Sequence, residues 1–271
     1  MDASRALTIA DLAAGYRNRP VLQGLRLTPL EAGKVTALVG PNAAGKSTLL
    51  RSLAGLVSST GTIRLGERDL NALRLAERAQ YVAYMPQALP QSAELSVLEA
   101  VISALKASPL ASFDGSGPAS HRRAVGVLDR LGILDLAMEG IGRLSGGQRQ
   151  LASLAQAIVR APHLLLLDEP TSALDLRHQH DVMTIVRELA REGRIVVVVL
   201  HDLTLAASWA DHLVVLDRGT VAAEGPPESA LTPSILSNVY GVEARVEHCS
   251  RGRLHVMVDG PSSAKEIRHA S

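Results

Sequence analysis

The run from Leu38 to Thr48, LVGPNAAGKST, constrains the fold of this chain more than any other stretch. It follows an apolar segment and opens a helical pattern, which is the context that the G-x-x-x-x-G-K-[ST] pattern requires. Gly40 and Gly45 allow the backbone to wrap closely around phosphates, while Lys46 places its ammonium against them and Ser47 can ligate Mg²⁺. The sequence therefore predicts a strand, a phosphate-binding loop and a helix, in that order.

A second apolar segment, from His163 to Leu167, ends in the two carboxylates of Asp168 and Glu169. In open α/β sheets, ligands bind at the carboxyl edge of the strands, where Lys46 should also lie. Asp168 is predicted to hold Mg²⁺ through its hard oxygens, and Glu169 to polarise the attacking water as a general base. An Asp-Glu pair also ends many strands by chance, so the pair alone does not establish a site.

The pentapeptide LSGGQ, from Leu144 to Gln148, stands between the phosphate loop and the two acids. Ser145 can cap the helix that follows, and Gly146 and Gly147 leave backbone N–H groups bare at its start, which makes an anion site. A turn with a helix cap explains the same letters when they are taken alone.

Together these motifs resemble the ATP-binding subunit of an ATP-binding cassette (ABC) transporter, and the resemblance covers nearly the whole chain. It implies an α/β fold, the P-loop NTPase fold of ABC ATPases, with a parallel-sheet core, an antiparallel β layer and a helical insertion. It also implies ATP as substrate and Mg²⁺ as cofactor. Residues 144–148 then match the family signature, and Ser172–Asp175 match its D-loop.

The resemblance also implies a role for each motif residue. Tyr16 stacks on adenine, Gln87 contacts the magnesium and the water and senses the membrane partner, and His201 hydrogen-bonds the γ phosphate. The implied catalytic residues are Lys46, Glu169 and His201, and the implied metal ligands are Ser47, Gln87 and Asp168. Nucleotide contacts come from Tyr16, Gly40, Pro41, Asn42, Ala43, Ala44, Gly45, Lys46, Ser47, Thr48, Gln87, Ser145, Gly146, Gly147, Gln148 and Asp168.

Simpler explanations exist for some of these residues. Tyr16 lies on an alternating strand and could be packed there, because tyrosine favours strands. Gln87, next to a proline at a strand end, is also typical of a solvated turn. His178 and His180 do not form a metal site with His201, since residues i and i+2 do not share a helix face. Ala43 departs from the family, which usually has glycine there; a positive φ at this position would cost alanine about 1 kcal/mol.

Composition excludes other classes of protein. With 28 basic and 27 acidic residues, a net charge of +1 and 2% aromatics, the 271-residue chain offers neither a nucleic-acid footprint nor a base-stacking platform. The single cysteine, Cys249, is expected to be a bystander in a C-terminal strand of a protein in the reducing cytosol. No apolar run approaches the roughly 20 residues of a membrane helix, and residues 1–5 do not begin a signal peptide.

The resemblance implies a single ABC ATPase domain over residues 1–271, and hydrophobic periodicity places helices and strands in its three parts. The core and β layer take residues 6–87 and 144–225, with strands over 6–40 and 62–65 and helices at 46, 145–160, 175–192 and 202–210. Residues 88–143 form the helical insertion, with two helices joined by the polar segment 108–120. Residues 226–271 form an extension with a helix over 232–240, strands over 243–248 and 253–259, and a loose end.

The resemblance implies a head-to-tail homodimer with ATP between Lys46 of one copy and Ser145 of the other. The partners would be two integral-membrane permease subunits and a substrate-binding protein, and the chain would lie peripherally at the cytoplasmic face of the inner membrane. The segments 171–179 and 239–243 resemble the importers of ferric siderophores, which have relatives for haem and cobalamin. An exporter ATPase, a soluble non-transport ABC protein and a P-loop kinase or GTPase remain as alternatives.

Overall fold

The computed structural model describes residues 6–17, 19–87, 95–107 and 117–262. A six-stranded sheet in the order β10-β9-β3-β8-β7-β6 forms its centre, and five of these strands are parallel. Because the parallel strands are fully or largely apolar, helices cover both of their faces. The strands are β3 (Val35–Val39), β6 (Val82–Met85), β7 (Leu164–Asp168), β8 (Ile195–Val199), β9 (His212–Asp217) and β10 (Thr220–Gly225).

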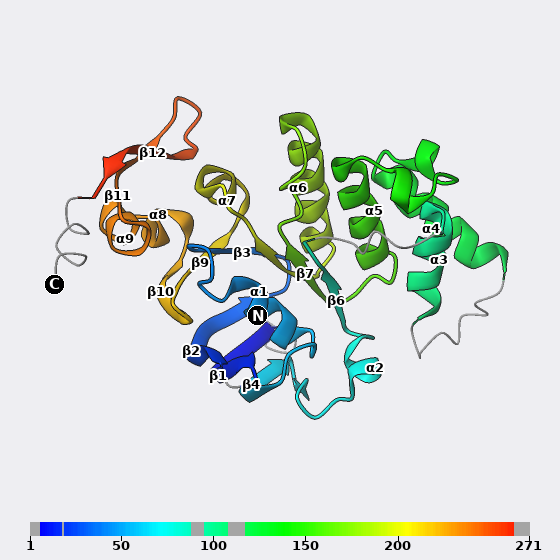
Figure 1. Cartoon of the computed structure of the whole chain (residues 1–271), viewed down its shortest axis with the longest axis horizontal. Helices are drawn as coiled ribbons and strands as arrows, with labels where there is room; N and C mark the ends of the chain where they lie inside the picture. Colours follow the sequence, from blue (N-terminus) through cyan, green and yellow to red (C-terminus); the bar gives the residue numbers. More distant parts are fainter. Residues whose placement is uncertain (1–5, 18, 88–94, 108–116, 263–271) are drawn as a thin grey trace.

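A second, antiparallel sheet in the order β2-β1-β4-β5 lies beside the central sheet, as the alternating N-terminal sequence predicts (Figure 1). Its strands are β1 (Ala6–Tyr16), β2 (Arg19–Glu31), β4 (Ser59–Leu65) and β5 (Arg68–Asp69). The helix α1 (Lys46–Leu53) buries Leu49, Leu50 and Leu53 in the apolar cluster that joins the two sheets. The phosphate loop is thereby held between both layers.

The helices α3 to α7 pack on the other face of the central sheet and beyond it, with α3, α4 and α5 at the right of Figure 1, whereas α2 lies beside α1. The two helices predicted within the insertion are α3 and α4, while residues 88–94 and 108–116, which include most of the predicted connection, lie outside the described residues. The elements are α2 (Leu75–Arg78), α3 (Val97–Lys106), α4 (Pro118–Arg130), η2 (Leu134–Leu136), η3 (Ile141–Arg143), α5 (Gly146–Ile158), α6 (Leu176–Arg191) and α7 (Leu203–Trp209).

The C-terminal extension, orange to red in Figure 1, packs against α7 and carries the predicted helix and strand pair. The helix ends in a π-helical turn, and burial raises the pKa of Tyr240 within it, beside the backbone of Gly40. Cys249 is a free thiol directly after β11. The elements are α8 (Pro227–Ala230), α9 (Pro233–Ile235), η4 (Leu236–Tyr240), β11 (Val242–His248) and β12 (Leu254–Pro261).

Some elements of the fold were not predicted from the sequence, and some predictions concern residues that the structure does not describe. The strands β9 and β10 and the short helix α2 carry no motif and were not predicted. Residues 1–5 and 263–271, for which no signal peptide and a loose end were expected, lie outside the described residues. Every helix within the described ranges is too short or too polar to cross a membrane.

Candidate active site

The phosphate loop leaves the buried strand β3 at Gly40 and enters α1 at Lys46. Gly40 has φ +146°, and a Cβ there would lie 2.2 Å from the carbonyl oxygen of Leu216 on the neighbouring strand. Only glycine therefore allows the chain to turn so close to the sheet. This turn aims the loop at the N-terminus of α1, as the sequence predicts.

Ala43 adopts φ +63°, so the loop does need a left-handed residue at the position where the family usually has glycine. The side chain of an L-residue is strained in this region by about 1–2 kcal/mol. We expect Ala43→Gly to stabilise the protein by about 1 kcal/mol, which would raise the thermal midpoint by about 2 °C in calorimetry. Ala44→Gly, at a buried alanine with no positive φ, should lower the midpoint. An unchanged or lower midpoint for Ala43→Gly would contradict the strain.

Lys46 is buried and folds back over the loop. Its Nζ donates hydrogen bonds to the carbonyl oxygens of Gly40 at 2.7 Å and Pro41 at 2.8 Å. Burial lowers the pKa of Lys46, and the nearby carboxylates of Glu169 and Asp168 oppose this effect. The lysine thus faces the same space as both acids, as the two motifs predict.

Asp168 ends β7 with no exposed surface. Its two oxygens accept hydrogen bonds from Ser47 Oγ and from the Tyr84 hydroxyl, each at 3.0 Å. Burial raises the pKa of Asp168, while these two hydrogen bonds lower it. Ser47 and Asp168 therefore place two hard oxygen atoms side by side, which is the donor chemistry that Mg²⁺ prefers.

Tyr84 and Arg51 join this cluster although no motif marks them as site residues. Arg51, on α1, donates from Nε to the Tyr84 hydroxyl and from Nη1 to the Tyr16 hydroxyl, each at 3.2 Å. Burial raises the pKa of Tyr84 to about 12, so its hydroxyl keeps its proton and can donate to Asp168. Hydrogen bonds therefore connect Tyr16 to Asp168.

Glu169 is held by contacts to both its side chain and its backbone. Its Oε2 accepts from Gln87 Nε2 at 2.7 Å and its Oε1 lies 2.5 Å from His201 Nε2. The backbone has φ +56°, a strained conformation that its surroundings must enforce. The buried Gln150 Nε2 donates to the Glu169 carbonyl oxygen at 2.6 Å, and Ser172 Oγ does so at 3.2 Å. Gln150 was not predicted, because its role depends on how α5 packs.

Gln87, Asp168 with Glu169, and His201 follow the carboxyl ends of β6, β7 and β8, so the sheet brings these motifs together. Gln87 donates a hydrogen bond to Glu169, and among the described residues it makes no hydrogen bond to Ser47 or Asp168. Tyr16, 43% exposed, stands at the rim of a cavity of about 300 Å³. The cavity is lined by Tyr16, Arg19, Val21, Asn42, Ala43, Ala44, Gly45, Lys46, Ser47, Thr48, Glu169 and His201.

The signature residues lie at the start of α5 and do not line this cavity among the described residues. Ser145 Oγ accepts from the backbone N–H of Gln148 at 3.3 Å, so Ser145 caps the helix as predicted. Gly147 packs tightly on the 172–175 segment: a Cβ there would lie 3.2 Å from the carbonyl oxygen of Ala173. Ser145 and Gly146 remain exposed. The backbone N–H groups at this exposed helix start are therefore accessible to an anion that another molecule holds.

The two other histidines that a metal site would need are used elsewhere. His178 Nδ1 lies 2.8 Å from Asp175, and the His180 ring meets Trp209 edge-on at 5.2 Å. Within the described residues, no group of three or more metal-binding side chains is close enough to hold an ion.

Comparison with known proteins identifies the family. The sequence profile of the ABC transporter family matches residues 22–172. The chain belongs to this family. The Hemin import ATP-binding protein HmuV of Rhodococcus jostii (strain RHA1) is 41% identical over 251 residues, covering 91% of this chain and 84% of the relative. ABC ATP-binding proteins are ATPases coupled to transport, and the chain is therefore a transport ATPase.

Solved structures agree with this assignment. An inward-facing metal-chelate type ABC transporter matches with a TM-score of 0.78 and 27% identity, covering 94% of this chain and 97% of that one. A dimeric post-hydrolysis ATP-binding cassette bound to ADP and phosphate matches with a TM-score of 0.72 and 25% identity, covering 82% and 98%. These likenesses confirm the predicted fold class and the ABC resemblance.

Proposed function

We propose that the chain is the ATP-hydrolysing subunit of an importer that takes up haem across the cytoplasmic membrane. The observation that carries the proposal is the 41% identity, over nearly the whole chain, to a hemin import ATP-binding protein. The metal-chelate type transporter supports the same class of cargo. The sequence alone favoured a ferric siderophore, and the names of the relatives favour haem within the same group of iron chelates.

ATP would occupy the cavity at the phosphate loop, with its base on Tyr16 and its phosphates on the loop and Lys46. Glu169 is placed to accept a proton from the attacking water because its side chain borders this cavity. His201 and Gln87 hold the two oxygens of Glu169 in position, and His201 also lines the cavity, where it can reach the γ phosphate. Mg²⁺, held by Ser47 and Asp168, would neutralise charge on the phosphate oxygens.

Tyr84 would position the magnesium-binding carboxylate through its 3.0 Å hydrogen bond to Asp168. A hydrogen bond to a charged group contributes about 1.5–3 kcal/mol. We therefore expect Tyr84→Phe to raise the Mg²⁺ concentration for half-maximal ATPase about tenfold, with nucleotide affinity in EDTA unchanged. Tyr81→Phe is the matched control and should behave as the unmodified protein. An unchanged Mg²⁺ dependence in Tyr84→Phe would contradict the positioning role.

A second copy of the chain would complete the site. Lys46 lines the cavity and Ser145 does not, yet the start of α5 presents exposed anion-binding N–H groups. In a head-to-tail homodimer, ATP bound to Lys46 of one copy meets Ser145 of the other. ATP then contacts both copies and favours the closed dimer, and loss of the γ phosphate contacts reopens it.

The permease partners would dock in a groove between the central sheet and the helical layer. This groove, of about 360 Å³, lies beside Pro86 and Tyr84 and is lined largely by alanine and leucine side chains. Leu56 and Leu75 on its rim are each 53% exposed. We infer that an apolar cytoplasmic segment of a permease subunit covers them, with residues 88–143 as the helical subdomain that transmits motion. The chain would then lie at the cytoplasmic face of the membrane.

Reconstitution with its two permease subunits and substrate-binding protein in liposomes tests the cargo. Haem delivered by the binding protein should stimulate ATP hydrolysis and accumulate in the lumen that represents the cytoplasm. Ferric siderophore and cobalamin are the matched comparisons, and each should leave the basal rate unchanged. Stimulation by a siderophore but not by haem would contradict the haem assignment, and outward transport would favour an exporter.

A further inference from the structure

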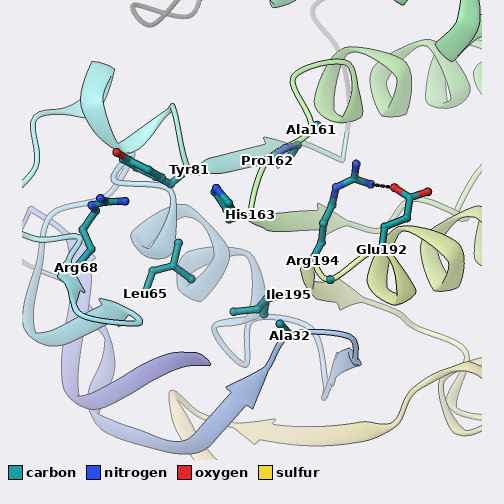
Figure 2. A pocket seen from close by; sticks show the side chains of 11 residues that line it. Ala32, Leu65, Arg68, Tyr81, Ala161, Pro162, His163, Glu192, Arg194 and Ile195 are labelled. Atoms are coloured by element: carbon teal, nitrogen blue, oxygen red, sulfur yellow. Dashed lines mark ion pairs between the residues drawn. The ribbon is translucent and has the colours of Figure 1, made fainter. Parts of the chain in front are cut away.

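A second cavity (Figure 2) lies at the edge of the central sheet opposite to the edge that carries the phosphate loop. It has a volume of about 490 Å³ and lies where the chain enters β6, β7 and β8. Gln87, Asp168 and His201 follow the other ends of these three strands. The cavity is lined by Ala32, Leu65, Arg68, Tyr81, Ala161, Pro162, His163, Glu192, Gly193, Arg194 and Ile195.

Two arginines from different segments face this cavity on opposite sides (Figure 2). Arg68 lies over the ring of Tyr81 at 3.9 Å, and among the described residues it has no carboxylate partner. Arg194 Nη1 is buried and forms an ion pair with Glu192 Oε2 at 2.9 Å. Because Glu192 balances only one of the two arginines, the lining carries one positive charge in excess.

The surroundings of Arg194 add to this excess of positive charge. Burial lowers the pKa of Arg194, Glu192 opposes the shift, and the charges of Arg130 and Arg123 lower the pKa further. Arginine nevertheless keeps its proton in proteins. An anion in the cavity would lower this positive potential, and Arg68 offers it a guanidinium group that has no carboxylate partner among the described residues.

The rest of the lining determines which uncharged part the ligand can have. The buried side chain of Ile195, with Leu65 and Ala32, forms an apolar wall below the arginines in Figure 2. Tyr81 has little free ring surface, because Arg68 lies over it and His163 stacks beside it with ring centroids 6.1 Å apart. An aliphatic body fits this wall, and an aromatic ligand finds no open ring to stack on.

We propose that this cavity is a binding site for a small aliphatic monocarboxylate. Its carboxylate pairs with Arg68 and faces Arg194 across the cavity, and its hydrocarbon part lies on Leu65 and Ile195. One carboxylate matches the single excess charge, whereas a dianion such as a phosphate monoester would meet Glu192. The site is separate from the nucleotide cavity and independent of the haem proposal.

Hexanoate is the probe, added to the full chain with saturating Mg–ADP so that the phosphate loop is occupied. Ligand-observed saturation-transfer NMR gives its Kd, and hexanamide is the neutral isostere. We expect saturable binding of hexanoate, and roughly fivefold weaker binding of hexanamide, because a charge-assisted hydrogen bond is lost. Equal affinity for the two molecules, or no saturable binding of hexanoate, would overturn the site.

Substitutions test whether hexanoate binds in this cavity. Arg68→Gln should weaken hexanoate binding roughly fivefold, since the unpaired charge is removed, and Arg68→Lys should retain most of it. Arg26→Gln removes an exposed arginine on β2 that pairs with Asp11 and should change nothing. Thermal unfolding checks that each variant is folded. Equal loss in Arg26→Gln and Arg68→Gln, or no loss in Arg68→Gln, would show that hexanoate binds elsewhere.

Discussion

Replacing Glu169 with glutamine is expected to slow ATP hydrolysis by about 10²–10⁴-fold, the usual contribution of a general base. Glutamine keeps the size of the side chain, and its amide can still meet Gln87 or His201, so the cavity should keep its shape. Equilibrium binding of a fluorescent ATP analogue should therefore stay close to that of the unmodified protein. Phosphate release in single-turnover assays measures the loss.

Glu188→Gln is the matched control for this substitution. Glu188 is an exposed glutamate on α6 that pairs with Arg130 and lies outside the nucleotide cavity. Its replacement should leave both phosphate release and ATP binding unchanged. Normal turnover in the Glu169→Gln variant would reject Glu169 as the base and would require another proton acceptor.

Ser145→Arg is expected to abolish steady-state ATPase, with a loss of at least about 10²-fold, while ATP binding is retained. ATP binding survives because Ser145 does not line the cavity around Lys46. Hydrolysis fails because a guanidinium at the exposed start of α5 blocks its approach to the phosphates held by the other copy. A loss of preorganised contacts to a reacting phosphate has effects of this size.

The Ser96→Arg variant is the control that distinguishes loss of the anion site from loss of a helix cap. Ser96 caps α3 with the same reciprocal pair of hydrogen bonds that Ser145 makes at α5. If cap loss alone caused the defect, both variants of the isolated subunit would lose ATPase to a similar degree. Full ATPase in Ser145→Arg would instead contradict a role of the signature in hydrolysis.

The sequence predicted the parts of the site that belong to contiguous motifs. Gly40 to Thr48, Asp168 with Glu169, and His201 each follow an apolar strand, and parallel strands bring their ends to one edge. The departure from glycine at Ala43 raised the question of a left-handed backbone, and the structure gives this residue a positive φ. The local sequence pattern was sufficient here because each of these residues stands at the end of its own strand, and the parallel sheet brings those ends together.

Other features could not be predicted from local pattern. Arg51 reaches Tyr16 and Tyr84 only after α1 packs between the two sheets, and Gln150 reaches Glu169 only after α5 packs on the central sheet. The strand β10 runs antiparallel at the sheet edge and carries no motif. Arg68 stands on the two-residue strand β5 and Arg194 directly before β8, in short polar segments whose sequences resemble ordinary solvated loops.

Sedimentation velocity of the Glu169→Gln subunit tests most directly whether two copies share each nucleotide. In ATP, this slowly hydrolysing variant should sediment as a dimer that holds two ATP molecules, and without ATP it should sediment as a monomer. The Glu169→Gln, Ser145→Arg double variant should bind ATP yet remain a monomer. A monomer for Glu169→Gln at saturating ATP, or an undiminished dimer in the double variant, would contradict the shared site.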